Sequence, residues 1–398
     1  MDTFLNFVQS NALYFSAGIL IISYIFIAIE KIPKITIALL GASLTLLLGL
    51  LGQNAKVNGV LDPSYFINFI DFNVIFLLVS MMIIVNITTR SGVFNWIANE
   101  MLIKTKGHPK TILFCLALFT AIASAFLDNV TTVILIMPVT FVIAETLAIN
   151  PVPYLIAEIL ASNIGGTATL IGDPPNIIIG RAANLSFMDF INELTPIVAV
   201  ILFIVILTMV FWFRKQLKTT PDKMELVAKL DNSQTIKDKA LMFRSLFVLL
   251  LVIAGFVTHD ITHIQTSLCA MTGASVLLIF EKPTDILRDV EWNTIFFFIG
   301  LFTIIGGFEK SGGIELMANW LLNITHGSQA IASMVILWGS GILSGIIDNI
   351  PYTATMAPMI ANIQATHGAA FTHPMWWCLS LGACLGGNLT IIGAAANV

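Results

Sequence analysis

Near the middle of an apolar segment the chain reads Asn163-Ile-Gly-Gly-Thr-Ala-Thr-Leu-Ile-Gly-Asp-Pro-Pro-Asn176. Three glycines, two prolines, a carboxylate and several hydroxyl or amide side chains interrupt the segment. Glycine and proline free backbone carbonyl groups from the helical ladder, and such oxygens can replace the hydration shell of an ion. The pattern therefore predicts a discontinuous membrane helix, at about 153–185, that contributes to an ion site.

A related pattern occurs near the C-terminus, in Gly386-Gly-Asn-Leu-Thr-Ile-Ile-Gly393 and Asn397. The similarity extends upstream at an offset of 220 residues, where Ser124-x3-Asp128-Asn129 matches Ser344-x3-Asp348-Asn349. Self-similarity at a fixed offset is the mark of an internal repeat. We therefore expect two sequence-related halves, each with an Asp-Asn element and a broken helix.

The composition places the chain in a lipid bilayer. Apolar residues make up 57% of the 398 positions and charged residues 11%, whereas a soluble domain carries roughly 25% charge. The apolar positions form runs near the length that crosses hydrocarbon. We expect an all-α polytopic membrane protein with clear apolar runs at 13–29, 35–51, 74–88, 196–213, 245–258, 264–280, 294–307 and 331–347.

The number of crossings between equivalent points of the halves is odd, which predicts inverted repeats, an arrangement typical of alternating-access transporters. Basic residues gather in cytoplasmic loops. With the 30–34 loop in the cytoplasm, 16 of the 19 lysines and arginines lie on that side, and only Lys56, Arg181 and Lys310 lie outside. We expect a multi-pass protein of the inner (plasma) membrane whose N-terminus is periplasmic or extracellular.

The ends of the chain and the linker between the halves complete the predicted organisation, which has three parts. At the N-terminus, Met1-Asp2-Thr3 lacks the basic region of a signal peptide, so the first apolar run is expected to stay as a helix. The second half ends one residue after Asn397, so a last crossing is expected to be missing from it. The parts are a first repeat at 1–214 (helical hairpin about 111–147, broken helix about 153–185), a cytoplasmic linker at 215–243, and a second repeat at 244–398 (hairpin about 328–363, broken helix about 374–398).

The intramembrane carboxylates carry most of the predicted chemistry. Asp128 and Asp348 each lie at the expected tip of a re-entrant hairpin, where a charged carboxylate is costly in hydrocarbon. Three alternative roles are open for these aspartates: they bind a cation, they carry protons, or they only cap helix starts. Asp173 aligns with Ala394 of the other half, and it either couples transport or forms a turn before two prolines. Ser124 and Ser344, one turn before the aspartates, either join the site or bond back to preceding carbonyls, and back-bonding is the expected role.

Together the four motifs closely resemble those of the P-protein-like permeases in the ArsB/NhaD group of the ion transporter superfamily. The resemblance runs from about residue 70 to the C-terminus. It implies a scaffold domain and a transport domain with elevator-type alternating access. Relatives exchange sodium for protons, export arsenite and antimonite, or move dicarboxylates or citrate. The implied substrate and ion site consists of Asp128, Asn129, Thr131, Asn163, Thr167, Thr169, Asp173, Asn176, Asp348, Asn349, Thr353, Asn388 and Thr390.

The function predicted from this site is efflux of a small inorganic species, driven by the proton-motive force. Neutral threonine and asparagine groups suit uncharged arsenite or antimonite better than a multivalent anion, because no arginine occurs in the four motifs. A sodium/proton antiporter is the alternative, and a channel is a third hypothesis.

Other classes of protein fit the sequence poorly. We expect no enzyme, because no nucleophile–base pair or nucleotide motif is present, so ATPase drive would need a separate subunit. The four cysteines lie in apolar segments without zinc-ligand spacing, and no basic stripe suggests nucleic acid. No metal or other cofactor is therefore predicted. The expected partners are the lipid bilayer, protons and the transported ion, and both a monomer and a homodimer fit.

Overall fold

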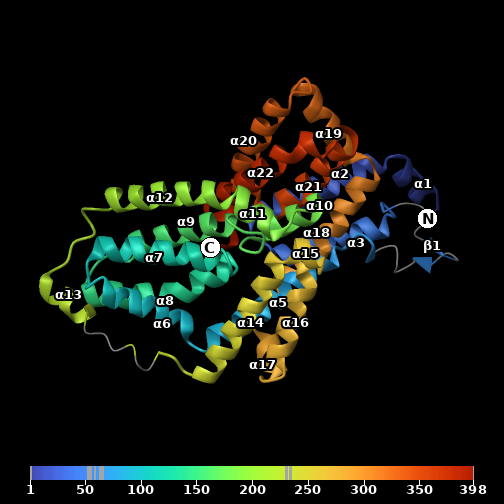
Figure 1. Cartoon of the computed structure of the whole chain (residues 1–398). Helices are drawn as coiled ribbons and strands as arrows, with labels where there is room; N and C mark the ends of the chain where they lie inside the picture. Colours follow the sequence, from blue (N-terminus) through green and yellow to red (C-terminus); the bar gives the residue numbers. More distant parts are fainter. Residues whose placement is uncertain are drawn as a thin grey trace. The chain divides into compact units, whose positions relative to one another are not determined.

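The computed structural model describes residues 2–51, 56–57, 60–61, 67–228, 232 and 235–397 (Figure 1). Parts of the predicted linker, 229–231 and 233–234, lie outside the described residues, as does Val398. The described chain is almost entirely α-helical, and its only described strands are the pair β1 (Lys56–Val57) and β2 (Val60–Leu61).

Seven helices of the described chain are long and apolar enough to cross a membrane. This confirms the predicted all-α polytopic architecture. These helices are α2 (Ala12–Ile29), α5 (Phe72–Arg90), α8 (Asn129–Leu147), α12 (Thr195–Trp212), α14 (Lys239–Val257), α18 (Trp292–Lys310) and α20 (Gln329–Ile347).

The remaining helices are shorter or more polar; α21 and α22, with 19 and 18 residues, are as long as the seven but less apolar. They are α1 (Asp2–Ser10), α3 (Lys34–Leu47), α6 (Val93–Lys104), α7 (Pro109–Ser124), α9 (Val152–Thr167), α10 (Pro174–Ala183), α11 (Phe187–Glu193), α13 (Pro221–Ala228), α15 (His259–Thr262), α16 (Thr266–Leu278), α17 (Pro283–Arg288), α19 (Gly313–Ile324), α21 (Asn349–His367) and α22 (Ala369–Gly386), followed by the 3-10 turns η2 (Ile391–Gly393) and η3 (Ala395–Asn397).

Helix boundaries recur along the chain as the sequence similarity does. Helices α18, α19 and α21 begin and end 220 positions after α5, α6 and α8. The same local signals thus start and stop the helices of both halves. The inverted orientation of the halves and the elevator movement stay predictions.

The predicted interruption of the first broken helix is present between Thr167 and Pro174, where α9 ends and α10 begins. Proline lacks a backbone N–H and is favoured in the first turn of a helix, so Pro174 and Pro175 open α10 at no hydrogen-bonding cost. In the second half, α22 ends at Gly386 and continues as 3-10 turns. Local sequence therefore places both breaks.

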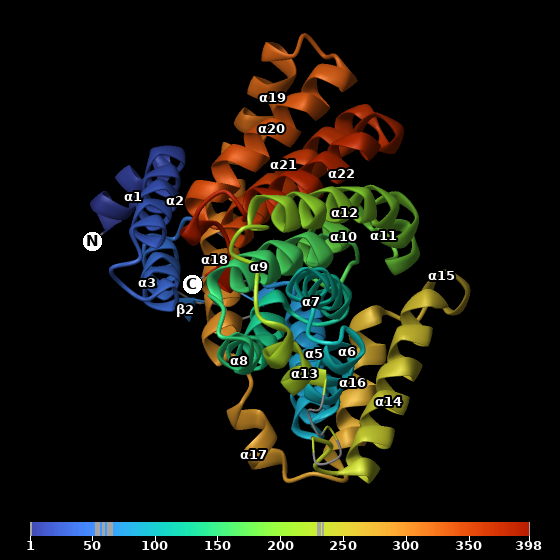
Figure 2. The same ribbon diagram turned by 90° about the vertical axis from the view of Figure 1, so that its left-hand side faces the viewer.

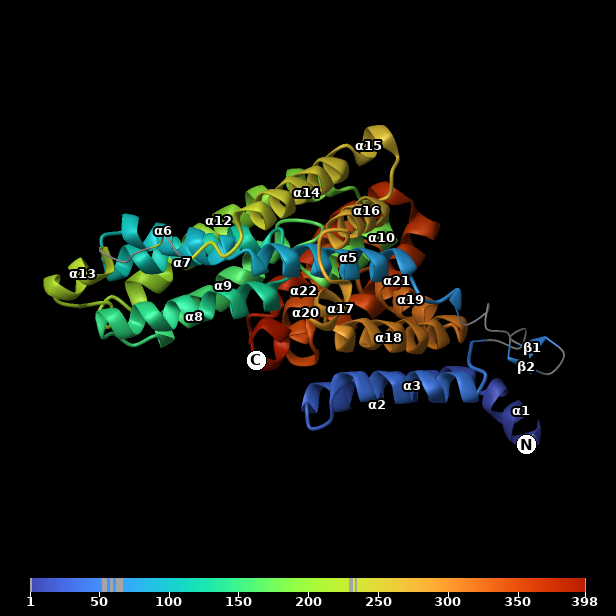
Figure 3. The same ribbon diagram turned by 90° about the horizontal axis from the view of Figure 1, so that it is seen from below.

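The chain forms two compact units that are interleaved in sequence. Unit 1 comprises Met1–Ile75, Ile178–Asn184 and Glu291–Gly393, and unit 2 comprises Phe76–Ile177, Leu185–Val290 and Ala394–Val398. In unit 1, α2 and α3 run alongside α18 (Figure 3). In unit 2, α7 and α8 both pack on α9 (Figure 1).

Small residues allow the hairpin helices and broken helices to cross closely. In unit 1, α20 and α22 lie side by side (Figure 2), and their facing motifs are Gly341-x3-Gly345 and Gly382-x3-Gly386. A Cβ added at Gly386 would lie 2.5 Å from the Gly341 carbonyl oxygen. In unit 2, a Cβ at Gly165 would collide with the backbone of Ala121. Such glycines let helix backbones approach within a membrane, so these crossings fix each hairpin against a broken helix.

Candidate functional site

The predicted site residues divide between the two units. Those from Asp128 to Asn176 lie in unit 2, and those from Asp348 to Thr390 lie in unit 1. Each unit therefore holds one Asp-Asn tip together with part of the broken-helix motifs. That the two tips face one central site remains a prediction from the sequence.

The tip in unit 2 is built on the N-terminus of α8. Asp128 is half-buried, and its Oδ2 accepts from the Thr131 backbone N–H at 3.1 Å and the Thr131 hydroxyl at 3.3 Å. Asp128 thus caps the helix, as one of the three alternatives held. Within the described chain, no salt bridge joins Asp128 to a lysine or arginine. Its negative charge is met by backbone N–H groups and a hydroxyl.

A chain of buried amides connects this tip to the broken helix of unit 2. The Asn129 Nδ2 donates to Asn163 Oδ1 at 3.1 Å, and the Asn163 Nδ2 donates to Asn397 Oδ1 at 2.9 Å. Asn129 and Asn163 are almost fully buried. Asn397 is absent from the predicted site, although its alignment with Asn176 in the repeat was a signal that could have identified it.

The other predicted residues of unit 2 stabilise the helix break. The Thr167 hydroxyl donates to the Asn163 carbonyl at 2.8 Å, and the Thr169 hydroxyl donates to the Ala125 carbonyl. The Asn176 amide donates to the carbonyls of Thr167 and Thr169 at 3.1 and 2.8 Å. Buried carbonyls outside a helix need such partners. The hydroxyl and amide hydrogens of these side chains are therefore donated to carbonyls of the break and its neighbours. Asp173, also in the break, is buried.

The two tip serines correct one prediction. Ser124 does not bond back along its own helix, because its hydroxyl donates to the Ser162 carbonyl of α9 at 2.8 Å. The Ser344 hydroxyl likewise donates to the Ala383 carbonyl of α22 at 2.6 Å. The close helix crossings bring these carbonyls within reach, so each serine joins its hairpin to a broken helix.

The tip in unit 1 carries a different charge arrangement. Asp348 is fully buried and caps α21, with Oδ1 accepting from the Ile350 N–H at 3.1 Å. The Lys34 ammonium, from the first residue of α3, forms an ion pair with Asp348 Oδ2. Lys34 also lies 3.7 Å from the Glu30 carboxylate. The charge pattern had assigned Lys34 to a loop, and no local signal linked it to Asp348.

The remaining predicted residues of unit 1 differ in exposure. Asn349 and Thr353 are buried, and the Thr353 hydroxyl has no hydrogen-bond partner among the described residues. Thr390 is exposed and donates to the carbonyl of Gly345 on α20, while Asn388 is half-buried. Thr353, near the start of α21, therefore offers a buried hydroxyl without a described hydrogen-bond partner.

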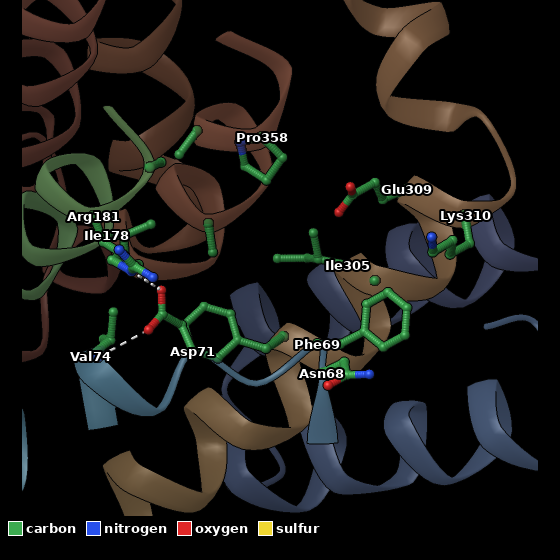
Figure 4. Close-up of a pocket in the computed structure, with 15 residues that line it drawn as sticks. Asn68, Phe69, Asp71, Val74, Ile178, Arg181, Ile305, Glu309, Lys310 and Pro358 are labelled. Atoms are coloured by element: carbon green, nitrogen blue, oxygen red, sulfur yellow. Dashed lines mark hydrogen bonds and ion pairs between the residues drawn. The ribbon is translucent and has the colours of Figure 1, made fainter. Parts of the chain in front are cut away.

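Unit 1 also contains a cavity of about 650 Å³, lined by α10, α18, α21 and residues 68–74 (Figure 4). Arg181 Nε donates to Asp71 Oδ2 at 3.0 Å on one wall, and the Lys310 ammonium lies 5.8 Å from the centre of the Phe69 ring. Figure 4 shows Glu309 and Lys310 on the opposite side from Arg181. Arg181 and Lys310 are two of the three basic residues predicted on the periplasmic or extracellular side, and both line this one cavity. No predicted site residue is among its described lining residues.

Comparison with known proteins identifies the family. The citrate transporter family matches residues 24–382 of the chain. The chain belongs to this family. An uncharacterized transporter of Mycobacterium tuberculosis is 42% identical over 384 residues, covering 96% of this chain and 88% of the relative. The 46 kDa membrane protein of Mycobacterium leprae is 40% identical over the same length and coverage.

More distant relatives include the P protein of Homo sapiens, 30% identical over 455 residues, which cover 94% of this chain and 54% of that protein. The chain therefore spans about half the length of the P protein. The resemblance to P-protein-like permeases is confirmed. The chain is a multi-pass membrane protein of a transporter family.

A comparison of the halves explains the cavity in this transporter. In unit 2, Arg90 forms a 2.6 Å ion pair with Asp289, and Asn86 donates to the Asp289 carbonyl at 3.0 Å. The positions equivalent to these three residues, 220 away, hold Lys310, Phe69 and Gly306. In unit 1, Phe69 packs against Gly306, and Lys310 has an aromatic ring where Arg90 has a carboxylate. Unit 1 therefore lacks, at this position, the carboxylate that pairs with Arg90 in unit 2, and Lys310 lines the cavity instead.

Proposed function

We propose that this protein is a secondary active transporter that uses the proton-motive force to export a small inorganic species, arsenite or antimonite. The observation that carries the proposal is the chemistry around Asp128 in unit 2. One carboxylate without a described basic partner lies beside the buried amides of Asn129 and Asn163.

Amide and hydroxyl groups suit a neutral hydroxylated solute, since they both donate and accept hydrogen bonds. A tricarboxylate such as citrate, after which the family is named, would instead require arginine or another fixed cation. At the other tip the Lys34 ammonium is already paired with Asp348. The described tips therefore favour an uncharged substrate over a multivalent anion.

Proton coupling is assigned to Asp128, because an intramembrane carboxylate that faces a polar site exchanges protons or cations as its surroundings change. The same carboxylate supports the second candidate function, sodium/proton antiport, in which asparagine and threonine oxygens would help to bind Na⁺. Asp173 and Asp348 are the other two carboxylates of that alternative.

The proposal includes a setting in the cell. The protein lies in the inner (plasma) membrane with its N-terminus outside, moves its site by an elevator-type displacement, and works as a monomer or homodimer. Protons and the inorganic solute are its partners. ATP-driven export would require a separate ATPase subunit.

The test expresses the full chain in cells that lack an arsenite exporter. We expect increased resistance to arsenite and antimonite and faster efflux at an acid outer pH. The Asp128→Asn variant should lose this resistance, whereas Lys31→Met, an exposed charge change, should keep it. No gain of resistance would reject arsenite and antimonite.

Proteoliposomes with purified protein then separate the candidates under an imposed pH gradient. Sodium-dependent collapse of the gradient, abolished by Asp173→Asn, would favour the antiporter. Citrate counterflow would favour an organic anion, and flux that follows the membrane potential alone would indicate a channel.

A further inference from the structure

The two Asp-Asn tips are related in sequence but differ in charge. Asp348 is fully buried and carries the Lys34 ammonium on its Oδ2. Asp128 is half-buried and has no described salt bridge. The tips therefore cannot perform the same ionic role.

Burial explains why Asp348 needs a fixed partner. A carboxylate removed from water is strongly destabilising unless a counter-ion and hydrogen bonds compensate it. Asp348 has 1% of its side chain exposed and obtains both, from Lys34 and from the Ile350 N–H. The Lys34 side chain is 27% exposed and also lies near Glu30. Its ammonium therefore lies between the partly exposed carboxylate of Glu30 and the buried carboxylate of Asp348.

The backbone at Asp348 supports the same conclusion. Its φ of +90° lies in a region that L-amino acids other than glycine rarely adopt, whereas Asp128 has a relaxed φ of −62°. Such strained residues persist where surrounding contacts over-determine them. The Lys34 ion pair and the capping bond to Ile350 are contacts of this kind.

The neighbouring helices of the two halves account for the difference in charge. Lys34 is the first residue of α3, the second helix of the pair that opens the first half. The second long helix that opens the other half, α16, begins with Thr266, which has no amine. The position 220 residues after Lys34 is Ala254, so neither residue offers an amine to the other half.

We propose that Lys34 is a resident counter-ion that fills the cation position of the Asp348 tip, so that the transporter exchanges one cation per cycle, at Asp128. A lysine ammonium is a compact monovalent cation on a flexible stem. It can therefore neutralise a carboxylate in place of a bound sodium ion or proton. The inference rests on the cation coupling of the proposed function. It adds how many cations are exchanged in each cycle and at which aspartate.

The experiment measures initial transport rate in proteoliposomes against the concentration of the driving cation. Four proteins are compared: the unsubstituted chain, Lys34→Met, Asp348→Asn and the double variant Lys34→Met/Asp348→Asn. Lys31→Met, an exposed lysine near Lys34, is the matched control. Thermal unfolding of each purified protein is a second readout that does not depend on transport.

We expect Lys34→Met to lose roughly tenfold or more in rate at low cation concentration, because it leaves a buried carboxylate without a counter-ion. At high concentration that carboxylate recruits a cation, and the Hill coefficient rises from about 1 to about 2. The double variant removes both charges, so its Hill coefficient should stay at about 1 and it should melt above Lys34→Met, since a paired charge replaced by neutral groups is tolerated.

Two outcomes would overturn the proposal. In the first, the double variant keeps the raised Hill coefficient of Lys34→Met, or melts no higher than Lys34→Met, so that Asp348 is not the group that Lys34 neutralises. In the second, Lys34→Met equals the unsubstituted chain in rate, cooperativity and unfolding temperature. If the unsubstituted chain shows no cation-driven transport, the proposed function fails, and unfolding alone then tests the counter-ion: Lys34→Met should melt earlier than the double variant.

Discussion

The crossing of α20 and α22 gives a prediction that depends on packing alone. Gly382 lies inside α22 at this crossing. An added Cβ would lie 2.5 Å from the Leu337 carbonyl oxygen, 2.6 Å from the Ser340 Cβ and 3.2 Å from the Gly341 nitrogen. These atoms belong to backbone or to a Cβ and cannot rotate away. The Gly382→Ala variant must therefore separate the two helices.

The size of the effect follows from these contacts. Overpacking a close-packed site is destabilising by about 1–3 kcal/mol, and the rigid neighbours favour the upper part of that range. Alanine also has a higher helix propensity than glycine, by about 1 kcal/mol. The control Gly339→Ala, inside α20, gains the same propensity, and nothing lies within 4 Å of its Cβ. The difference between the two variants isolates the packing term, about 2–3 kcal/mol.

Thermal unfolding of the detergent-purified proteins measures this difference. We expect Gly382→Ala to melt about 4–12 °C below Gly339→Ala, at about 2–4 °C for each kcal/mol in a large domain. The control should melt at or slightly above the unsubstituted chain. A Gly382→Ala protein that melts as high as the control would refute the close crossing of α20 and α22.

Three further variants test other contacts by the same unfolding measurement. Glu158→Gln should raise stability by about 1 kcal/mol, because the amide keeps the hydrogen bond from Thr140 and removes a negative charge from a fully buried side chain. A lower melting temperature would contradict this. A double-mutant cycle on Asp71 and Arg181 should give a coupling free energy of only about 0.2–1 kcal/mol, since the ion pair is partly exposed. A larger coupling would contradict this partial exposure. Asn163→Leu should lose about 2–4 kcal/mol by removing two side-chain amide hydrogen bonds, one buried and one partly buried. Unchanged stability would exclude this chain of amides.

Local patterns in the sequence determined most of the secondary structure. Apolar runs, the proline pair at 174–175 and the aspartates at helix starts all act within a few residues, so they predict where helices begin, end and break. The repeat offset carried that information from one half to the other. The motifs also identified the family, because they are long and unusual in composition.

Contacts within the site were decided only by the tertiary structure. Lys34 and Asp348 are separated by 314 positions, and Asn163 and Asn397 by 234. The long helices are apolar on nearly every face, so periodicity does not specify which side meets a neighbour. For the same reason the serines were assigned to their own helices, although the glycine crossings bring another helix within reach. The sequence by itself thus determined which polar groups enter the membrane, and packing decided which of them are neutralised, because a partner's charge acts only over the few ångströms that folding sets.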